Sequence, residues 1–409
     1  MLQQRMRKTQ FYPLYLVIFF GYFGYALALT IFTPMFLHLK GGLLPAETSP
    51  ASRVLILGIV LTLYPLGQFL GSPIMGSLSD RLGRRPVLIV TLIITTICYA
   101  LIAISLEVQH LLLLCIALLV GGFSESNVVT AQSAVVDVTE PAERPVQFGY
   151  IYAAVTLSFI VAPLLGGFLA IRSYALPFWI SCGLLGLGTL YVIFSFKETH
   201  PENLRIKGRY FEALFNLKEV VTNRRLRFYY WVNFSLYLAI YGYFRAYPIY
   251  IVDQYGLGPT GVGLYIAWAA VPILIANFWL VKFFSKRFGP GKIAIGAAIL
   301  TGLSLIAIVI PKQQDWLLLT SFFAALSLSL CLPALVSLLS QHALESQQGT
   351  TMGNNQALQV AAEALSSFMS GVIATAMMRL PLIVWGLVAF LGAILLLFRE
   401  GLRLNAKGR

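Results

Sequence analysis

The chain has 409 residues, of which 58% are hydrophobic and only 11% are charged, against roughly 25% charged residues in soluble domains. These proportions exclude an ordinary soluble enzyme, a disordered chain and a secreted disulfide scaffold, and they indicate a protein that crosses a membrane many times. The net charge of +13 would also suit a nucleic-acid-binding protein, so the position of the basic residues along the chain has to separate the two explanations.

Twelve apolar stretches are long enough to cross a bilayer as a helix, which takes about 20 residues. The first stretch is too long for a cleavable signal peptide, and no small-residue cleavage site follows it. We therefore predict an all-α membrane protein with twelve transmembrane helices. The predicted spans are 13–37, 54–75, 87–106, 111–135, 147–170, 175–196, 228–251, 261–283, 291–311, 316–340, 350–378 and 381–398.

The lysine and arginine residues of the connecting segments lie mostly on one side of these spans. With the N-terminus in the cytoplasm, 23 of them are cytoplasmic and 5 are on the opposite side. Because basic residues favour the cytoplasmic side, both termini are predicted to be cytoplasmic. The excess positive charge is then a topology signal, and nucleic acid is excluded as a partner. We expect a multi-pass protein of the cytoplasmic (inner) membrane, surrounded by lipid and monomeric.

The longest polar segment, residues 197–227, divides the spans into two sets of six. We predict an N-terminal six-helix bundle (1–200), a cytoplasmic linker (201–227) and a C-terminal six-helix bundle (228–409). A weak repeat supports pseudo-symmetric halves, since residues 78–83 read LSDRLG and residues 284–289 read FSKRFG. Two parallel six-helix halves with a binding site between them form a known architecture of secondary transporters.

Residues 76–86, GSLSDRLGRRP, form the most specific stretch of the sequence. Its glycines permit a close helix approach and a tight turn, and its aspartate could accept hydrogen bonds from the N-terminus of a neighbouring helix. Its arginines can pair with carboxylates or lipid phosphates. A plain basic cytoplasmic loop is the alternative. The predicted members of a conformational latch are Gly76, Asp80, Arg81, Gly83, Arg84 and Arg85.

This glycine, aspartate and arginine spacing resembles the loop signature of the major facilitator superfamily, G-x-L-x-D-R-x-G-R-R. The fifth span is similar to a helix motif of the drug:proton antiporters in that superfamily, through Gly149, Pro163, Gly166 and Gly167. The combination of Asp137, Arg144 and Phe148, together with the sequence KET at 197–199, is similar to transporters of the tetracycline-efflux type. The resemblance implies the major facilitator fold and transport by alternating access.

Three positions depart from these family patterns. Leu118 stands where the family often has an arginine, and Gly24 stands where tetracycline exporters carry an acid in the first span. In the second copy of the loop, Lys286 replaces the aspartate. The proton and substrate chemistry of the tetracycline exporters therefore does not carry over to this chain, and tetracycline itself is not the expected substrate.

Three charged residues lie deep in predicted spans, namely Glu125, Arg245 and Glu363. Charges in the bilayer interior are costly and indicate functional sites. We predict Glu125 and Glu363 as proton-coupling groups, and Arg245 as a group that binds an anionic part of the substrate or pairs with one of the acids. A permanent buried ion pair that only fixes helix packing is the alternative.

Polar and aromatic residues recur at helical spacing beside these charges, which predicts faces that line a water-filled cavity. Aromatic rings on such faces could stack on a flat or cationic ligand, although ordinary packing is the alternative. The predicted substrate-binding residues are Arg245, Tyr241, Tyr237, Asn233, Gln359, Gln356, Tyr22 and Trp268.

The sequence lacks the motifs of ATP hydrolysis, metal binding and enzyme catalysis. There is no phosphate-binding G-x-x-x-x-G-K-[ST] motif, which argues against ATP hydrolysis. The four cysteines and four histidines show no metal-ligand spacing and no catalytic partner, so no enzyme activity, metal or cofactor is expected.

The sequence thus predicts a secondary active transporter of a small organic solute, with proton-coupled efflux antiport as the first hypothesis. Proton-coupled import of an anionic or zwitterionic nutrient or a siderophore-type chelate is the alternative, motivated by Arg245. A non-transporting sensor on the same fold is a third possibility, which would call for an additional domain.

Overall fold

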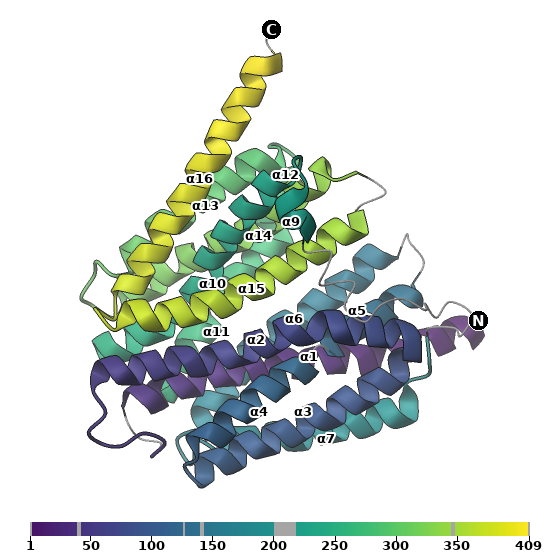
Figure 1. Cartoon of the computed structure of the whole chain (residues 1–409), viewed down its shortest axis with the longest axis vertical. Coiled ribbons are helices and arrows are strands. Elements are labelled where there is room, and N and C mark those ends of the chain that lie inside the picture. Colours follow the sequence, from purple (N-terminus) through teal and green to yellow (C-terminus); the bar gives the residue numbers. More distant parts are fainter. Residues whose placement is uncertain are drawn as a thin grey trace. The chain divides into compact units, whose positions relative to one another are not determined.

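A computed structural model describes residues 2–38, 42–125, 127–139, 143–199, 218–344 and 348–407. Within these ranges the chain consists of helices and their connections, as predicted (Figure 1). Residues 201–217 of the predicted linker, 201–227, lie outside the described residues. By length and composition, eleven helical stretches of the described residues can cross a membrane.

Each predicted span corresponds to one or more helices, but some helices extend well beyond the predicted ends. The first helix begins at Leu2 and not at 13, the second ends at Leu82 and not at 75, and the last ends at Lys407 and not at 398. The N-terminal helices are α1 (Leu2–Leu37), α2 (Pro50–Leu82), α3 (Arg84–Glu107), α4 (Leu111–Ser124), α5 (Asn127–Asp137), α6 (Arg144–Leu169) and α7 (Leu176–Ser195). The C-terminal helices are α9 (Lys218–Thr222), α10 (Arg227–Tyr255), α11 (Pro259–Ile275), the π-helical turn η2 (Ala276–Leu280), α12 (Val281–Ser285), α13 (Pro290–Ile308), α14 (Trp316–His342), α15 (Gln348–Ala374) and α16 (Leu380–Lys407).

The seventh predicted span forms as α10, although it is not among the eleven apolar stretches. It carries eight tyrosines, Asn233 and Arg245, which lower its mean hydropathy. Most of α10 is nevertheless buried, and it packs along α15 and α16 (Figure 1). A helix that is surrounded by protein can carry polar groups that a lipid-facing helix cannot, so α10 completes the set of twelve.

The fourth predicted span is interrupted. α4 ends at Ser124 and α5 begins at Asn127, with Glu125 in the turn between them. The break follows the pair Gly121 and Gly122. Glycine and short polar side chains disfavour the helix interior, because they lose backbone entropy or compete for backbone hydrogen bonds.

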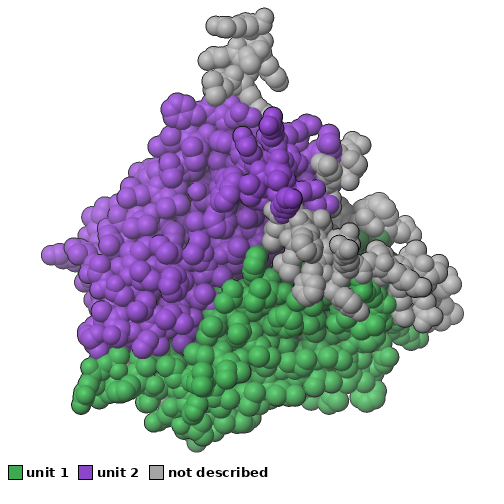
Figure 2. Space-filling model, in the orientation of Figure 1, with its two compact units in different colours: residues 1–48, 63–215, 258–264 green, residues 49–62, 216–257, 265–409 purple. Residues whose placement is uncertain are grey.

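Contacts divide the chain into two compact units (Figure 2). Unit 1 comprises Met1–Thr48, Leu63–Phe215 and Gly258–Leu264, and unit 2 comprises Ser49–Thr62, Asn216–Leu257 and Tyr265–Arg409. The beginning of α2 is thus grouped with the C-terminal helices and the beginning of α11 with the N-terminal ones. The division into bundles 1–200 and 228–409 stays a prediction.

Each unit is held together by helices that run side by side. In unit 1, α1 packs against α5, α6 and α7, and α3 packs against α4 and α7. In unit 2, α13 packs against α14 and α16, and α10 packs against α15 and α16. Helices in a membrane gain little from apolar burial, so close backbone approach and interhelical hydrogen bonds decide which faces meet.

Two glycines of α2 and α4 show how close that approach is. A Cβ atom added at Gly122 would lie 2.0 Å from the carbonyl oxygen of Tyr64, and one added at Gly67 would lie 2.2 Å from that of Leu119. Both distances are far below a normal contact, and both neighbours are backbone atoms. Glycine at these positions therefore sets how α2 and α4 cross.

Candidate functional site

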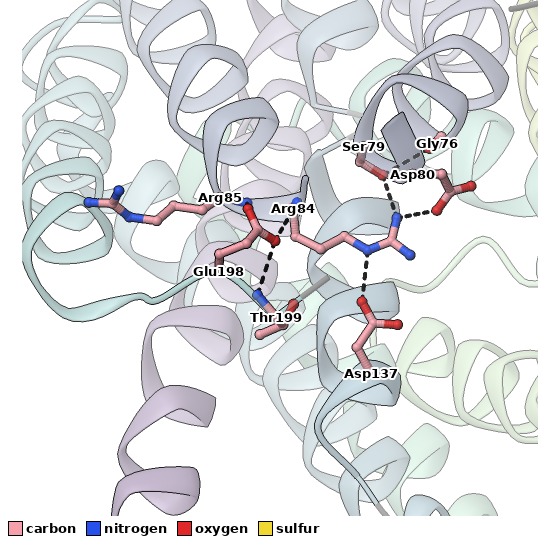
Figure 3. A network of polar contacts seen from close by, with 8 residues as sticks. All are labelled: Gly76, Ser79, Asp80, Arg84, Arg85, Asp137, Glu198 and Thr199. Atoms are coloured by element: carbon pink, nitrogen blue, oxygen red, sulfur yellow. Dashed lines mark hydrogen bonds and ion pairs between the residues drawn. The ribbon is translucent and has the colours of Figure 1, made fainter. Parts of the chain in front are cut away.

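Arg84 is the centre of a polar network at the junction of α2 and α3 (Figure 3). Its guanidinium donates from Nε to Asp137 Oδ2 at 2.9 Å, and from Nη1 to Ser79 Oγ at 2.6 Å and to Asp80 Oδ1. Arg84 is buried and satisfies two carboxylates from two helices. Such charge-assisted bonds are roughly twice as strong as neutral ones, so Arg84 ties α5 to the end of α2.

Glu198 occupies the N-terminus of α3 (Figure 3). Its Oε1 accepts from the backbone N–H of Arg84 at 2.8 Å and its Oε2 from that of Arg85 at 3.1 Å. The prediction that Asp80 receives a helix N-terminus is therefore wrong for α3. Asp80 lies one turn before Arg84 and pairs with it, whereas Glu198 follows α7, which packs along α3.

The motif is less of a loop than the sequence suggests, because α2 continues to Leu82. Gly83 alone separates α2 from α3, and its φ of 101° requires glycine. Gly76 is different, since an added Cβ would meet no atom of the described chain within 4 Å. The described residues therefore show no close approach at Gly76, and its part in a latch stays a prediction. Arg81 and Arg85 are half-buried, and Arg85 donates to the carbonyl of Ile193.

Replacing Arg84 by methionine is expected to lower thermal stability on the order of 2 kcal/mol, because two part-buried carboxylates lose their charged donor. The thermal midpoint of the purified protein in detergent measures this. Arg85→Met is the matched control, since the Arg85 side chain makes one bond to a carbonyl. Equal losses in the two variants would contradict the central role of Arg84.

Glu125 lies in the break between α4 and α5 and is only 2% exposed. Its Oε1 packs against α1 at Gly21, where an added Cβ would be 2.8 Å away. Its Oε2 has no hydrogen-bond partner among the described residues. The structure thus gives this carboxyl group a close-fitting place, and no described residue supplies it with a cation.

Aromatic rings cluster on the same region of α1. Tyr25, one turn after Gly21, contacts the rings of Tyr64 and Phe159 at centroid distances of 5.6 and 6.2 Å. Tyr22 contacts Phe159 at 6.1 Å. Tyr64 lies on α2, and its ring approaches Gly121 on α4, one turn before Glu125. Of these rings, Tyr22 was a predicted binding residue, and it is half-buried.

Gly24 shows why the first span carries no acid at this position. An added Cβ would lie 1.5 Å from the hydroxyl oxygen of Tyr99 on α3. Tyr99 is fully buried and fills the space that a side chain at position 24 would need. Among the described residues of unit 1, the buried acid is Glu125, on the fourth span.

Arg245 and Glu363 form a buried ion pair between α10 and α15 in unit 2. Arg245 Nη2 donates to Glu363 Oε1 at 2.9 Å, and both residues are less than one tenth exposed. The backbone carbonyl of Glu363 also accepts from the hydroxyls of Ser366 and Ser367. The two charges predicted from the sequence are thus brought together, and in this arrangement Arg245 is engaged by a carboxylate of the same unit.

Asn355 was missed by the sequence reasoning. Its Oδ1 accepts from the Tyr237 hydroxyl at 3.0 Å and from Asn233 Nδ2 at 3.3 Å. All three residues are buried. Tyr237 and Asn233 therefore hold α10 against α15 through Asn355, which favours a structural role for these two predicted binding residues. The signal for Asn355 was its place in the polar stripe that holds Gln356 and Gln359.

The other predicted binding residues are less buried than this cluster, although Gln359 interacts with Tyr237. Tyr241 and Gln359 are half-buried, and Gln356 is exposed. Trp268 is half-buried and donates from Nε1 to the carbonyl of Leu318. Among the described residues, no three histidine, cysteine, aspartate or glutamate side chains gather in a way that could hold a metal ion.

The antiporter-like motif of α6 combines two kinds of glycine. An added Cβ would lie 2.3 Å from the side chain of Leu27 at Gly166 and 2.7 Å from the carbonyl oxygen of Pro259 at Gly167. A Cβ added at Gly263 on α11 would lie 2.2 Å from the carbonyl oxygen of Pro163 on α6. At Gly149 an added Cβ would meet nothing described within 4 Å, so the expected close packing there is wrong. The side chains of Arg144 and Phe148 lie outside the description.

The sequence matches the family model of the Major Facilitator Superfamily over residues 14–278 and 229–407, which together span most of the chain. The chain belongs to the Major Facilitator Superfamily. It is therefore a multi-pass membrane transporter that acts on a small-molecule substrate, and not an enzyme.

Curated relatives of this superfamily member include drug-resistance proteins. It is 28% identical to the tetracycline resistance protein of class C from Escherichia coli, over 83% of this chain and 84% of the relative. It is 23% identical to multidrug resistance protein 2 from Bacillus subtilis, over 94% of both chains. Among solved structures, it is similar in fold to a D-xylose–proton symporter, with a TM-score of 0.76 and 15% identity over 94% of this chain and 96% of the symporter.

Proposed function

We propose that this superfamily member exports a small organic solute in exchange for protons, across the cytoplasmic membrane and with both termini in the cytoplasm. The resistance proteins among its relatives support efflux. The distribution of basic residues supports the orientation. In this mechanism the two halves of the transporter rock about a central site.

The observation that carries proton coupling is the environment of Glu125. It is buried, its Oε2 has no partner among the described residues, and the sequence places no lysine or arginine within the predicted spans of the N-terminal half. An uncompensated buried charge is very costly, so the group stays neutral or takes a counter-charge. A proton or a cationic substrate group provides that charge, and exchange of the two at one carboxyl couples their movements.

The two acids have different roles in this proposal. Glu363 has Arg245 as a counter-charge, whereas Glu125 has no such partner in its own unit. We therefore assign proton loading to Glu125. The Arg245–Glu363 pair would be an ionic contact that substrate or protonation breaks in one state of the cycle. The rings of Tyr22, Tyr25 and Phe159, which are half-buried, would stack on a flat substrate.

The network around Arg84 supports the proposal that residues 76–86 hold the transporter in one of its conformations. It joins α2, α3 and α5 by ionic bonds that either hold together or break as a group. Such bistable contacts suit a transporter, which must stabilise two arrangements of its helices in turn. Asp80→Asn would remove one charge from the latch without removing its shape, and altered turnover with intact folding would support the assignment.

Replacing Glu125 by glutamine is expected to abolish transport driven by a pH gradient, because glutamine keeps the shape of the carboxyl group but carries no exchangeable charge. Proteoliposomes with an imposed gradient and a panel of fluorescent organic solutes measure this. Glu47→Gln, at an exposed position, is the control. Unchanged gradient-driven transport in E125Q would remove Glu125 from the proton path.

Import of an anionic or zwitterionic solute remains the second candidate. Arg245 favours it, because it is the one basic residue that lies deep in a predicted span rather than at a span end. An anionic substrate would have to displace Glu363 from Arg245, and the released carboxyl group could then take up a proton. The direction of solute movement relative to the imposed pH gradient separates this candidate from antiport.

A further inference from the structure

The second copy of the repeated motif, at the end of the eighth span, has lost its acidic residues. Lys286 stands where the first copy has Asp80, and the sequence contains no aspartate or glutamate between Asp253 and Asp315. Four basic residues fall in the segment 282–292, namely Lys282, Lys286, Arg287 and Lys292. The two copies therefore differ in charge as well as in sequence.

That difference has a structural consequence. In the first copy, Arg84 is buried and neutralised by Asp80 and Asp137. In the second copy, Lys282, Lys286 and Arg287 are exposed, and no ion pair of the described residues involves them. A local excess of three positive charges without a counter-charge among the described residues attracts an external anion.

Exposed aromatic side chains lie directly beside these charges. Phe278 and Trp279 in the π-helical turn η2 are each 67% exposed, and Phe283 and Phe288 are about half exposed. The guanidinium of Arg287 lies 4.3 Å from the centroid of the Phe283 ring. Spacing of four residues places Lys282 beside Lys286 and Phe283 beside Arg287 along one side of the last turns.

The segment 278–288 therefore begins with two exposed aromatic rings and continues with exposed basic groups that alternate with further aromatic rings. Aromatic side chains favour the boundary between the hydrocarbon and the headgroups of a bilayer, and basic side chains near a membrane attract anionic lipids. A soluble anion would satisfy the charges but would leave the rings in water. A lipid satisfies both, because its acyl chains cover the rings while its headgroup contacts the basic residues.

We propose that residues 278–288 bind an anionic phospholipid, whose acyl chains cover Phe278, Trp279 and Phe283 and whose phosphate contacts Lys282, Lys286 and Arg287. The stacking of Arg287 on Phe283 keeps a positive charge beside an aromatic ring, so one lipid molecule can contact both. The predicted orientation places this site in the cytoplasmic leaflet. The inference is independent of the transported substrate and of proton coupling.

The test uses the full chain in nanodiscs or detergent with defined lipids. Native mass spectrometry counts phosphatidylglycerol molecules that stay bound, and titration with a fluorescent phosphatidylglycerol gives the affinity. The variant is Lys282→Gln, Lys286→Gln and Arg287→Gln combined. We expect it to lose one retained lipid and to bind phosphatidylglycerol on the order of a hundredfold more weakly, since each of the three basic residues near a membrane surface strengthens anionic-lipid binding about fivefold. Phosphatidylcholine should bind both proteins equally.

A control with the same loss of charge is Arg172→Gln, Lys312→Gln and Arg379→Gln combined, all exposed and on the opposite predicted side. This control should keep its lipid. An equal loss in the two triple variants would show a general charge effect and overturn the proposal. Displacement of the lipid by inorganic phosphate at millimolar concentration would overturn it too, because the site would then recognise a free anion. Thermal midpoints establish that each variant is folded.

Discussion

Removing one member of the Arg245–Glu363 pair is expected to destabilise the protein by about 3–5 kcal/mol, because the other charge stays buried without a partner. The pair is buried between α10 and α15, with Arg245 Nη2 2.9 Å from Glu363 Oε1. Typical domains are stable by only roughly 5–15 kcal/mol. Each single variant should therefore lose a large part of its folded population in detergent.

The two single variants should differ from each other. In Arg245→Leu the remaining carboxyl group can take up a proton and become neutral, whereas in Glu363→Leu the remaining guanidinium cannot lose its proton under ordinary conditions. Glu363→Leu should therefore be the less stable of the two. The double variant should be more stable than either, since no buried charge remains.

This order of stability is measured by heating the purified variants and determining by size-exclusion chromatography how much of each stays folded. A double variant that is as unstable as the sum of the singles would show that the pair does not act as a unit. Transport by the double variant answers a separate question. If the double variant is folded but inactive, the pair takes part in the transport cycle, and if it is active, the pair only holds α10 against α15.

Replacing Gly122 by alanine is expected to destabilise unit 1 by about 1–3 kcal/mol or more, through overpacking at the crossing of α2 and α4. The new Cβ atom would lie 2.0 Å from the carbonyl oxygen of Tyr64. A backbone oxygen cannot rotate away, so the two helices would have to separate. Since Glu125 follows Gly122 by three residues, transport should suffer as well.

Gly183→Ala is the matched control for this variant. Gly183 also lies in a helix of unit 1, α7, but an added Cβ there would meet no described atom within 4 Å. Alanine in a helix interior is favoured over glycine by roughly 0.5–1 kcal/mol. The control should therefore be unchanged or slightly stabilised. Similar thermal midpoints for the two variants would contradict the close crossing of α2 and α4.

The candidate site was only partly predictable from sequence. The cost of a charge in the bilayer singled out Glu125, Arg245 and Glu363 without any structure. Their environments were not predictable, because Arg245 meets a partner 118 residues away while Glu125 meets the backbone of α1 at Gly21. Asn355 was missed because a neutral amide in a polar stripe carries little cost, and its importance comes from the two side chains that it joins.

The motif of residues 76–86 shows the same limit. Its spacing correctly indicated the superfamily and the sharp turn at Gly83. The carboxylate at the N-terminus of α3 is nevertheless Glu198 and not Asp80. A carboxylate can reach a helix N-terminus from any neighbouring element, and the packing of α7 along α3 decides which one does so.

The sequence by itself determined that the chain lies in a membrane and where its helices run, because hydropathy and length are local properties of each segment. It also limited the interior chemistry to three charges, since so few charged residues occur in the spans. Only the tertiary structure decided which of these charges is paired and which glycines lie where two helices cross closely. Pairing and close approach depend on atoms that are distant in sequence, and no local pattern records the position of a neighbour.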